Sequence, residues 1–379
     1  MSEFLSTIRV FHNIFKFIGI SPVDISKSSR GTSFAFAGYS LMIVLITSLL
    51  LYGSVVITTS IYTESQYIAK LLDNTNLWAI LSMHIYVQFE SWRKHNVLVD
   101  MTKQFDEIDH QLVKNFQVKF DRALLRRNIL PFGLIYSYTF SSVLCLTTLH
   151  IYWDCCWIYW LFTFLAEFVV RWKYIQICIY VTSIDERVKI LAKEGRKYLK
   201  ELELTRFDSR REREKVLDKI FYFKDIYTRF WWICDSFNDC FGYTIVVLYL
   251  TSFLNLISRT FWFYIGTHAN LDYPENLLVS IESVLYPPPI LLQLFIVCRC
   301  CYNCRKNNER TKQIWHSIPN SRFDPYLNHA IRELSLQLLH ENLIFTGAGF
   351  FELNFKALGG LILAATIYLV ILLQFQTES

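Results

Sequence analysis

The sequence is poor in charged residues for its length of 379. Only 19% of the residues are Asp, Glu, Lys or Arg, whereas 53% are hydrophobic and 17% are aromatic. An ordinary soluble domain carries about 25% charged residues, so this composition excludes a typical soluble protein. It predicts an all-α, polytopic membrane protein, whose helices each need roughly 20 mainly apolar residues to cross the bilayer.

The sequence also lacks the motifs of common enzyme classes. It contains no Gly-x-Ser-x-Gly, no His-Glu-x-x-His, no phosphate-binding loop and no Gly-x-Gly-x-x-Gly, the patterns that mark hydrolases, zinc proteases and nucleotide-binding folds. We therefore expect no catalytic residues, cofactor, metal or nucleic-acid partner. No internal repeat is visible, which argues against a secondary transporter built on such repeats.

Signals for secretion and glycosylation are missing as well. The first twenty residues include Glu3, Arg9, His12 and Lys16, and no small-residue cleavage site follows an apolar core. We therefore expect no cleaved signal peptide, and the first span itself targets the chain. No Asn-x-Ser/Thr sequon occurs. The outer loops are short, so an external ligand has to enter between the helices.

Seven apolar segments are long enough to cross a bilayer. His84, Gln88 and Glu90 interrupt the second, where His84 is interpreted as bonded between helices, with a ligand contact as the alternative. Pro287-Pro288-Pro289 removes three backbone donors from the sixth, so either that helix bends around a cavity or the span begins later. The segments are Phe34–Thr58, Thr75–Ser91, Ile129–Leu149, Tyr152–Val170, Gly242–Ile265, Leu277–Cys298 and Leu353–Phe375.

The distribution of Lys and Arg predicts which side of the membrane each loop faces, because these residues mark cytoplasmic loops. They concentrate in the N-terminal segment, in residues 93–127, in residues 187–229, which hold fourteen, and in residues 299–356, which hold eight. The opposite side has only Lys70. With seven spans, this asymmetry places the N-terminus inside and the C-terminus outside, opposite to a G-protein-coupled receptor.

We expect the cytoplasmic segments to form a helical anchor layer below the membrane. Residues 185–229 combine both charge signs with apolar residues at helical spacing, which indicates helices with one buried face. The run Arg206–Lys219 is interpreted as a solvated face or loop, with contact to lipid headgroups as the alternative. The predicted divisions are a cytosolic N-terminal segment (1–33), spans one to four (34–184) with a cytosolic extension (92–128), anchor helices (185–236), spans five and six (237–298), an anchor segment (299–352), and the last helix with a short outer tail (353–379).

The ten cysteines do not form the pattern of a secreted disulfide framework. Cys298, Cys300, Cys301 and Cys304 cluster at the predicted inner end of the sixth span. Plain thiols are the favoured interpretation, and palmitoylation is the first alternative. A zinc site is disfavoured, because no pair of histidines lies at ligand spacing.

Polar and aromatic residues in the outer halves of the spans predict a ligand cavity, since small-molecule sites combine aromatic walls with a few oriented polar groups. Arg259 and Glu282 are expected to pair, so that neither charge faces lipid. For each Trp or Tyr taken alone, an aromatic belt at the membrane interface is the favoured interpretation. The candidates are Trp78, Ser82, Trp153, Trp157, Trp160, Asn255, Arg259, Trp262, Glu282 and Tyr286.

The end of the chain carries a recognisable motif. Tyr368 is followed by five aliphatic residues and then by Gln374 and Phe375, and residues 345–354 read Phe-Thr-Gly-Ala-Gly-Phe-Phe-Glu-Leu-Asn. The first piece resembles the C-terminal signature of insect gustatory receptors, which reads Thr-Tyr, five hydrophobic residues and Gln-Phe. The second piece resembles the Phe-Thr-x-x-Gly-Phe-Phe-x-Leu-Asn run that precedes this signature in the same family. The position of the signature Thr holds Ile367 here, and Thr366 stands one residue early.

The resemblance implies that the last helix lines a cation pore, with Gln374 and Phe375 as its gate near the outer end. Hydrophobic constrictions can gate by dewetting. A helical wheel places the small and aliphatic residues of this helix on the same face as Gln374, and Tyr368 is expected to brace the helix against a neighbour. From the residues alone, ordinary helix packing through small residues is the favoured interpretation of that face, and the resemblance reverses this preference. Its members are Gly360, Ala364, Ile367, Ile371 and Gln374.

The same resemblance implies a ligand-gated, nonselective cation channel in the plasma membrane of insect sensory-neuron dendrites. The expected partners are a small-molecule tastant or contact pheromone, permeant cations, the lipid bilayer, and further subunits that complete a homo- or heterotetramer with related receptors. The alternative is a seven-helix metabotropic chemoreceptor that signals through a G protein, which an N-terminus on the outside would support.

Overall fold

The computed structural model describes residues 3–21, 38–49, 52–53, 67–118, 122–152, 157–204, 210–268, 277–278, 280–281, 285, 287–318 and 325–378. Most of these residues are helical, and a short hairpin precedes the last helix. The elements are α1 (Glu3–Thr7), α2 (Arg9–Phe17), α4 (Tyr67–Arg93), α5 (His95–Phe116), α6 (Arg122–Tyr152), α7 (Trp157–Leu204), α8 (Arg210–His268), α10 (Pro287–His316), α11 (Pro325–His340), β1 (Thr346–Gly347), β2 (Phe351–Glu352) and α12 (Phe355–Glu378).

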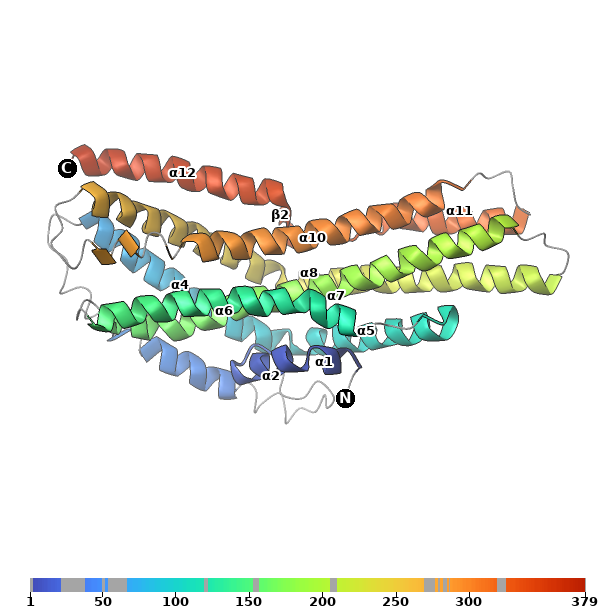
Figure 1. Ribbon diagram of the computed structural model, residues 1–379, viewed down its shortest axis with the longest axis horizontal. Helices are drawn as coiled ribbons and strands as arrows, with labels where there is room; N and C mark the ends of the chain where they lie inside the picture. The colour runs from blue at the N-terminus through green and yellow to red at the C-terminus, as the bar shows by residue number, and fades with distance from the viewer. Residues whose placement is uncertain are drawn as a thin grey trace.

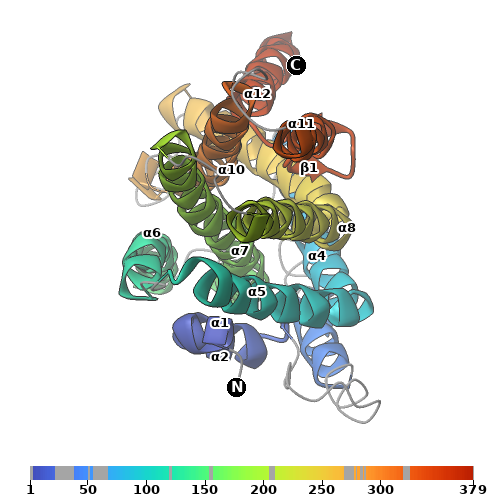
Figure 2. The ribbon, with the colours of Figure 1, turned by 90° about the vertical axis from the view of Figure 1, so that its right-hand side faces the viewer.

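The helices form an elongated bundle whose members run close to its long axis (Figure 1). The longest two, α7 and α8, lie at the centre, and the other helices surround them (Figure 2). α7 packs against α10, α6 and α4, while α8 packs against α4, α12, α5 and α11. One large apolar core joins these helices along most of the bundle.

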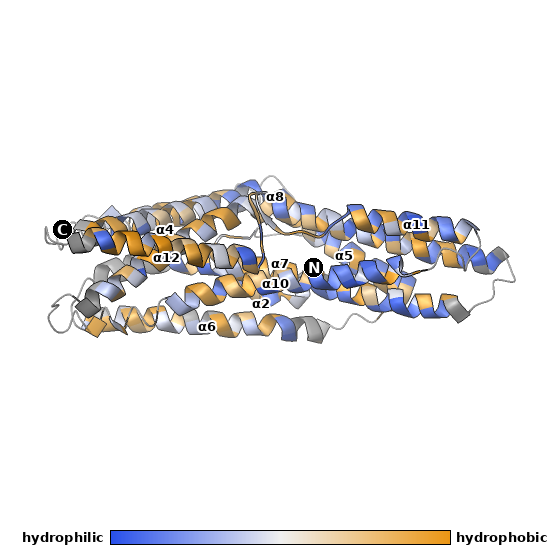
Figure 3. Ribbon diagram, turned by 90° about the horizontal axis from the view of Figure 1, so that it is seen from above, coloured by the Kyte–Doolittle hydropathy of each residue, from blue (hydrophilic) through white to orange (hydrophobic). Residues whose placement is uncertain are grey.

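The two halves of the bundle differ in polarity. Hydrophobic residues dominate the half that contains α6, α12 and the C-terminal end, and hydrophilic residues dominate the half that contains α5 and α11 (Figure 3). Three helical stretches within the described residues are long and apolar enough to cross a membrane: Arg127–Leu149, Arg213–Tyr264 and Phe355–Phe375. A shorter apolar helix covers Gly38–Leu49. The protein is therefore mostly helical, with helices apolar enough to span a membrane, and the number of spans and their orientation stay predictions.

No break separates the predicted anchor layer from the spans, because α7 and α8 continue from the apolar half into the polar half (Figures 1 and 3). Arg211, Arg213 and Lys215, near the start of α8, are exposed. This agrees with a solvated face for the described part of the basic run. Residues 206–209 of the run Arg206–Lys219 lie outside the described residues.

The three consecutive prolines are helical and are the first described residues of α10. Leu285, just before them, is helical as well, whereas residues 282–284 and 286 lie outside the described residues. Both alternatives for this segment, a helix that bends and a span that begins later, therefore stay open.

The cysteine cluster is mostly buried. Cys298, Cys301 and Cys304 have almost no exposed surface, and the Sγ atom of Cys298 lies 3.1 Å from the hydroxyl of Tyr249. A side chain enclosed in this way leaves no room for an attached acyl chain. The structure therefore favours plain, packed thiols at these three positions over palmitoylation.

A buried ion pair joins α7 to α5 in the polar half. Arg187 is fully buried and donates from Nε and Nη2 to the two carboxylate oxygens of Asp109, at 2.8 and 2.6 Å. Its guanidinium also lies over the rings of Phe4 and Phe105, 5.5 and 4.7 Å from their centroids. This arrangement fixes α1, α5 and α7 to one another.

The end of α2 is held by side chains from three other helices. Helices leave their last carbonyl groups without internal partners, and here four consecutive carbonyls at and after the end of α2 each accept a side-chain hydrogen bond. The chain turns at Gly19, whose φ of +75° favours glycine. Tyr39 donates to the carbonyl of Phe17, Gln88 to that of Ile18 at 2.8 Å, Ser40 to that of Gly19 at 3.4 Å, and Gln176 to that of Ile20 at 3.3 Å.

Candidate functional site

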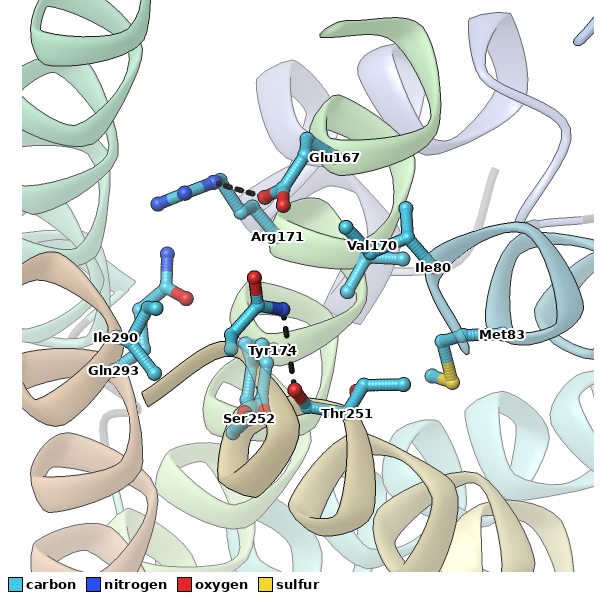
Figure 4. A pocket seen from close by; sticks show the side chains of 11 residues that line it. Ile80, Met83, Glu167, Val170, Arg171, Tyr174, Thr251, Ser252, Ile290 and Gln293 are labelled. Atoms are coloured by element: carbon cyan, nitrogen blue, oxygen red, sulfur yellow. Dashed lines mark hydrogen bonds and ion pairs between the residues drawn. The ribbon is translucent and has the colours of Figure 1, made fainter. Parts of the chain in front are cut away.

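A small cavity with many polar groups lies between four helices of the apolar half, and its volume is about 20 Å³ (Figure 4). A space of this size holds a water molecule but no organic ligand. An organic molecule bound here would therefore have to separate the surrounding helices. The lining side chains are Ile80 and Met83 of α4, Glu167, Val170, Arg171 and Tyr174 of α7, Thr251, Ser252 and Asn255 of α8, and Ile290 and Gln293 of α10.

An ion pair forms one wall of this cavity. Nε of Arg171 donates to Oε2 of Glu167 at 3.1 Å, and the two side chains are only 5% and 11% exposed. Their spacing of four residues places both on one face of α7. Charged side chains at this depth are costly unless paired, and they often mark functional sites in membrane proteins.

Hydrogen bonds orient the other polar groups of the cavity. The hydroxyl of Tyr174 donates to the carbonyl of Leu248 at 3.0 Å and lies 2.8 Å from Oγ of Ser252. Asn255 accepts a hydrogen bond from Nδ2 of Asn76 at 3.0 Å and donates to the carbonyl of Thr251. A ligand that enters meets groups already held in position, which favours selective recognition.

The predicted ligand residues are distributed over the apolar half. Asn255 lines the cavity. Arg259, one turn further along α8, is buried, and Trp262 is half-buried. Trp78 and Ser82 are exposed on α4 and do not line this cavity.

The remaining predicted ligand residues cannot be placed against the cavity. Trp153, Glu282 and Tyr286 lie outside the described residues, and Trp157 and Trp160 belong to α7 but their side chains are not described. The pairing of Arg259 with Glu282 stays a prediction.

Sequence reasoning missed Glu167, Arg171, Tyr174 and Gln293. Ending the fourth span at Val170 placed Arg171 outside the membrane region and separated it from Glu167. The sequence contained a usable signal, since opposite charges four residues apart within an apolar stretch form a pair on one helix face.

The face of α12 that was predicted to line a pore is uncovered. Ile367, Ile371 and Phe375 are 51%, 40% and 59% exposed, Gln374 is exposed as well, and Ala364 is half-buried. Only 11% of the most apolar stretch of α12 is buried, compared with 61% for that of α8. A helix this apolar needs lipid or another protein surface against this face.

The opposite face of α12 packs on α8, and α12 also contacts α10. Leu369, Leu372 and Leu373 lie against a cluster around the fully buried Phe261. The ring of Tyr368 contacts that of Phe253 edge-on, with centroids 5.7 Å apart. This contact to α8 is the one described interaction of the predicted bracing residue, and it joins the rings rather than the hydroxyl.

Polar contacts continue from the cavity to this packed face. One turn before Asn76 on α4, Oδ1 of Asp73 accepts hydrogen bonds from Oγ of Ser258 at 3.1 Å and from Nε1 of Trp262 at 2.9 Å. Trp262 also packs against the Phe261 cluster. The same segment of α8 therefore contacts both the cavity and α12.

The Phe-Thr-x-x-Gly-Phe-Phe motif forms the hairpin that precedes α12. Thr346 pairs with Glu352 and Gly347 with Phe351. Ala348 and Gly349, the two central residues of the β-turn from Gly347 to Phe350, both have positive φ, at 49° and 78°, as a type I′ turn requires. The motif glycine at position 349 meets this requirement without strain.

The hairpin is docked on α8. Asn238 donates to the carbonyl of Ile344 at 2.7 Å and accepts from the backbone N–H of Thr346 at 2.9 Å, so its amide continues the backbone pairing. One turn further on, a Cβ atom at Gly242 would lie 2.9 Å from the backbone nitrogen of Ala348. The close approach needs glycine at position 242.

The last residue of the motif begins α12. Oδ1 of Asn354 accepts hydrogen bonds from the backbone N–H groups of Lys356 and Ala357, both at 3.0 Å. This is the geometry of an N-cap, for which Asn is among the preferred residues. The motif thus fixes where α12 starts and against which part of α8.

Comparisons with known proteins agree with this architecture. The family model for the 7tm chemosensory receptor matches residues 8–379. Putative gustatory receptor 2a of Drosophila melanogaster is 23% identical over 245 residues, which cover 58% of this chain and 56% of the relative. Putative gustatory receptor 98a of the same species is 23% identical over 212 residues, covering 55% and 53%. The matched region thus spans about half the length of these relatives.

Solved structures share the fold. The insect olfactory receptor OR5 from Machilis hrabei superposes with a TM-score of 0.67 at 14% identity, covering 97% of both chains. The same receptor in complex with eugenol superposes with a TM-score of 0.65 at 12% identity. With one family model matched over nearly its whole length, this chain belongs to the 7tm chemosensory receptor family.

Proposed function

We propose that the protein is a gustatory receptor of insect sensory neurons that acts as a ligand-gated, nonselective cation channel. In this proposal a small-molecule tastant or contact pheromone binds in the cavity between α4, α7, α8 and α10. The uncovered face of α12 lines a pore between four subunits in the plasma membrane, and Gln374 and Phe375 form its gate.

The observation that carries the proposal is the division of α12 into two faces. One face packs on the segment of α8 that also contacts the cavity, and the other, with Ile367 and Ile371, is exposed. Binding of a ligand that needs a larger cavity favours a conformation with these helices further apart. Because α12 rests on α8, such a shift has a direct route to the pore face. The relatives' names and the eugenol complex of OR5 support the ligand class.

Recording from the purified protein in a planar bilayer tests the proposal. The panel includes sugars, bitter compounds and cuticular hydrocarbons. We expect agonist-dependent cation currents without any added signalling protein. If responses in cells require a G protein and the purified protein passes no current with the same agonist, the channel proposal is wrong.

The cavity is tested by removing one hydroxyl from it. Tyr174→Phe keeps the ring and deletes the group bonded to Ser252 and Leu248. We expect the agonist concentration for half-maximal current to change about three- to tenfold, since a hydrogen bond contributes about 0.5–1.5 kcal/mol.

Tyr198→Phe is the matched control, because its hydroxyl donates to the carbonyl of Val216 in the polar half. That variant should respond like the wild type. An unchanged response of both Tyr174→Phe and Asn255→Ala, at normal surface expression, would place the ligand site elsewhere.

The proposed orientation predicts where terminal tags become visible. Because Lys and Arg concentrate on one side, an N-terminal tag should stain only permeabilised cells, whereas a C-terminal tag should stain intact ones. Staining of an N-terminal tag on intact cells would overturn this topology and support the metabotropic alternative.

A further inference from the structure

A second, larger space, which shares no lining residue with the cavity, lies on the side of the bundle where the N-terminal helices meet α6. It is a groove of about 760 Å³. Val10 and Phe11 of α2 form one wall, Leu130 and Leu134 of α6 form the other, and Trp172 of α7 contributes as well. Val10, Leu130 and Leu134 are largely exposed, so an apolar wall is accessible from outside the bundle.

The polar residues that the N-terminal segment contributes gather at one end of the groove, and α6 contributes one further polar residue, Ser137. Phe4 of α1 packs on Tyr180 with ring centroids 6.0 Å apart, whereas Phe11 packs on Trp172 at 6.3 Å. Because α7 runs from the apolar into the polar half (Figures 1 and 3), the beginning of the N-terminal segment lies toward the polar half. The polar lining residues of this segment all come from that end: Ser6, Thr7 and Arg9.

The groove is a preformed feature of the fold. The wall that α2 forms is held at its end by the four side-chain hydrogen bonds from Tyr39, Ser40, Gln88 and Gln176. The two walls approach each other at Gly133, where a Cβ atom would lie 3.6 Å from the ring of Phe11.

The polar end carries positive charge. Arg9 is exposed, and no carboxylate among the described side chains pairs with it. Arg127, two residues before the groove residue Ile129, is also exposed. Burial, followed by the nearby Lys16 ammonium, lowers the pKa of His12 to about 4, so His12 adds no charge at pH 7.

We propose that this groove binds an anionic phospholipid, with an acyl chain along the apolar wall and the phosphate at Arg9. The groove matches such a lipid in both shape and charge. Its apolar side chains offer a surface for an acyl chain, and the guanidinium of Arg9, toward the polar half of the bundle, offers a positive charge for the phosphate. A zwitterionic lipid offers the same chain but no net charge, and a soluble anion offers charge without the chain. The inference concerns a site separate from the ligand cavity and the pore, so it does not depend on the proposed channel activity.

The test counts lipids bound to the purified full-length receptor by native mass spectrometry. The receptor is titrated in detergent with equal amounts of phosphatidylserine and phosphatidylcholine. We expect phosphatidylserine to be retained preferentially. Arg9→Gln should reduce that preference about fivefold, the effect of one basic residue near an anionic lipid surface. Leu134→Trp, which places an indole in the groove from an exposed position, should lower the binding of both lipids.

Lys16→Gln is the matched control, because it removes the same charge from the same helix and Lys16 does not line the groove. It should leave the preference intact. Equal retention of both lipids by the wild type overturns the proposal. An equal loss in Arg9→Gln and Lys16→Gln also overturns it, since that result indicates general attraction to a charged surface. Unchanged binding in Leu134→Trp places the lipid elsewhere on the receptor.

Discussion

Receptors that carry Phe375→Ala are expected to conduct without ligand. Phe375 is 59% exposed near the end of α12, beside Gln374, and the substitution removes one aromatic ring from each of four proposed subunits. If each ring contributes about 1 kcal/mol to a dewetted closed state, the ratio of open to closed channels rises roughly a thousandfold. The measurement is the resting current relative to the maximal current with agonist.

Two further variants separate gating from packing. Gln374→Ala removes a polar group that faces ions or its symmetry mates, so it should alter permeability or the stability of the open state more than closure. Phe221→Ala makes the same ring-to-methyl change at a half-exposed position on α8, well before the cavity residues, and it should leave the resting current low. If Phe375→Ala channels pass no current at rest and conduct normally when ligand is added, Phe375 has only a packing role.

Loss of the Asp109 carboxylate is expected to be the most destabilising single change described here. Asp109→Ala leaves the guanidinium of Arg187 fully buried without the carboxylate that holds it at 2.6 and 2.8 Å. Breaking a buried pair in this way costs about 3–5 kcal/mol, a large part of the stability of a folded domain. The expected result is a lowered melting temperature of the purified receptor and a reduced amount at the cell surface.

A surface pair on the same helix provides the control. Asp100 and Lys103 lie 3.3 Å apart but are 69% and 64% exposed, so Asp100→Ala should cost less than about 1 kcal/mol. Replacing both buried partners, as in Asp109→Leu with Arg187→Met, should restore much of the lost stability, because apolar substitutes remove both desolvated charges. Equal melting temperatures for Asp109→Ala and Asp100→Ala would show that the buried pair has no special importance.

The sequence was most informative for α12. Its composition predicted a membrane helix, the wheel predicted which residues share a face, and the terminal motif predicted the family. The structure exposes that predicted face, from Gly360 to Gln374, because the bulky leucines on the other side pack on α8. Periodicity captures such a division, since it depends only on residues three and four apart.

Contacts between distant segments were not predictable in this way. The N-terminal segment was expected to be cytosolic without a defined packing partner, yet Phe4, Ile8 and Phe15 are buried in the main core. Their spacing of four and seven residues follows one helix face. The hydrogen bonds from Gln88 and Gln176, however, go to backbone carbonyls, which exist at every residue and leave no trace in the sequence.

α8 contains 59 residues and no proline, and sharp kinks in helices arise mainly at proline and a few other identifiable defects. At 1.5 Å per residue its path is about 88 Å long, and this path changes direction near its middle (Figure 1). For one arm of about 44 Å, a tilt of about 5° displaces the far end by roughly 4 Å. The hairpin before α12 is attached at Asn238 and Gly242, close to the middle of α8. A tilt of the arm that borders the proposed ligand cavity therefore acts on the attachment point of the last helix.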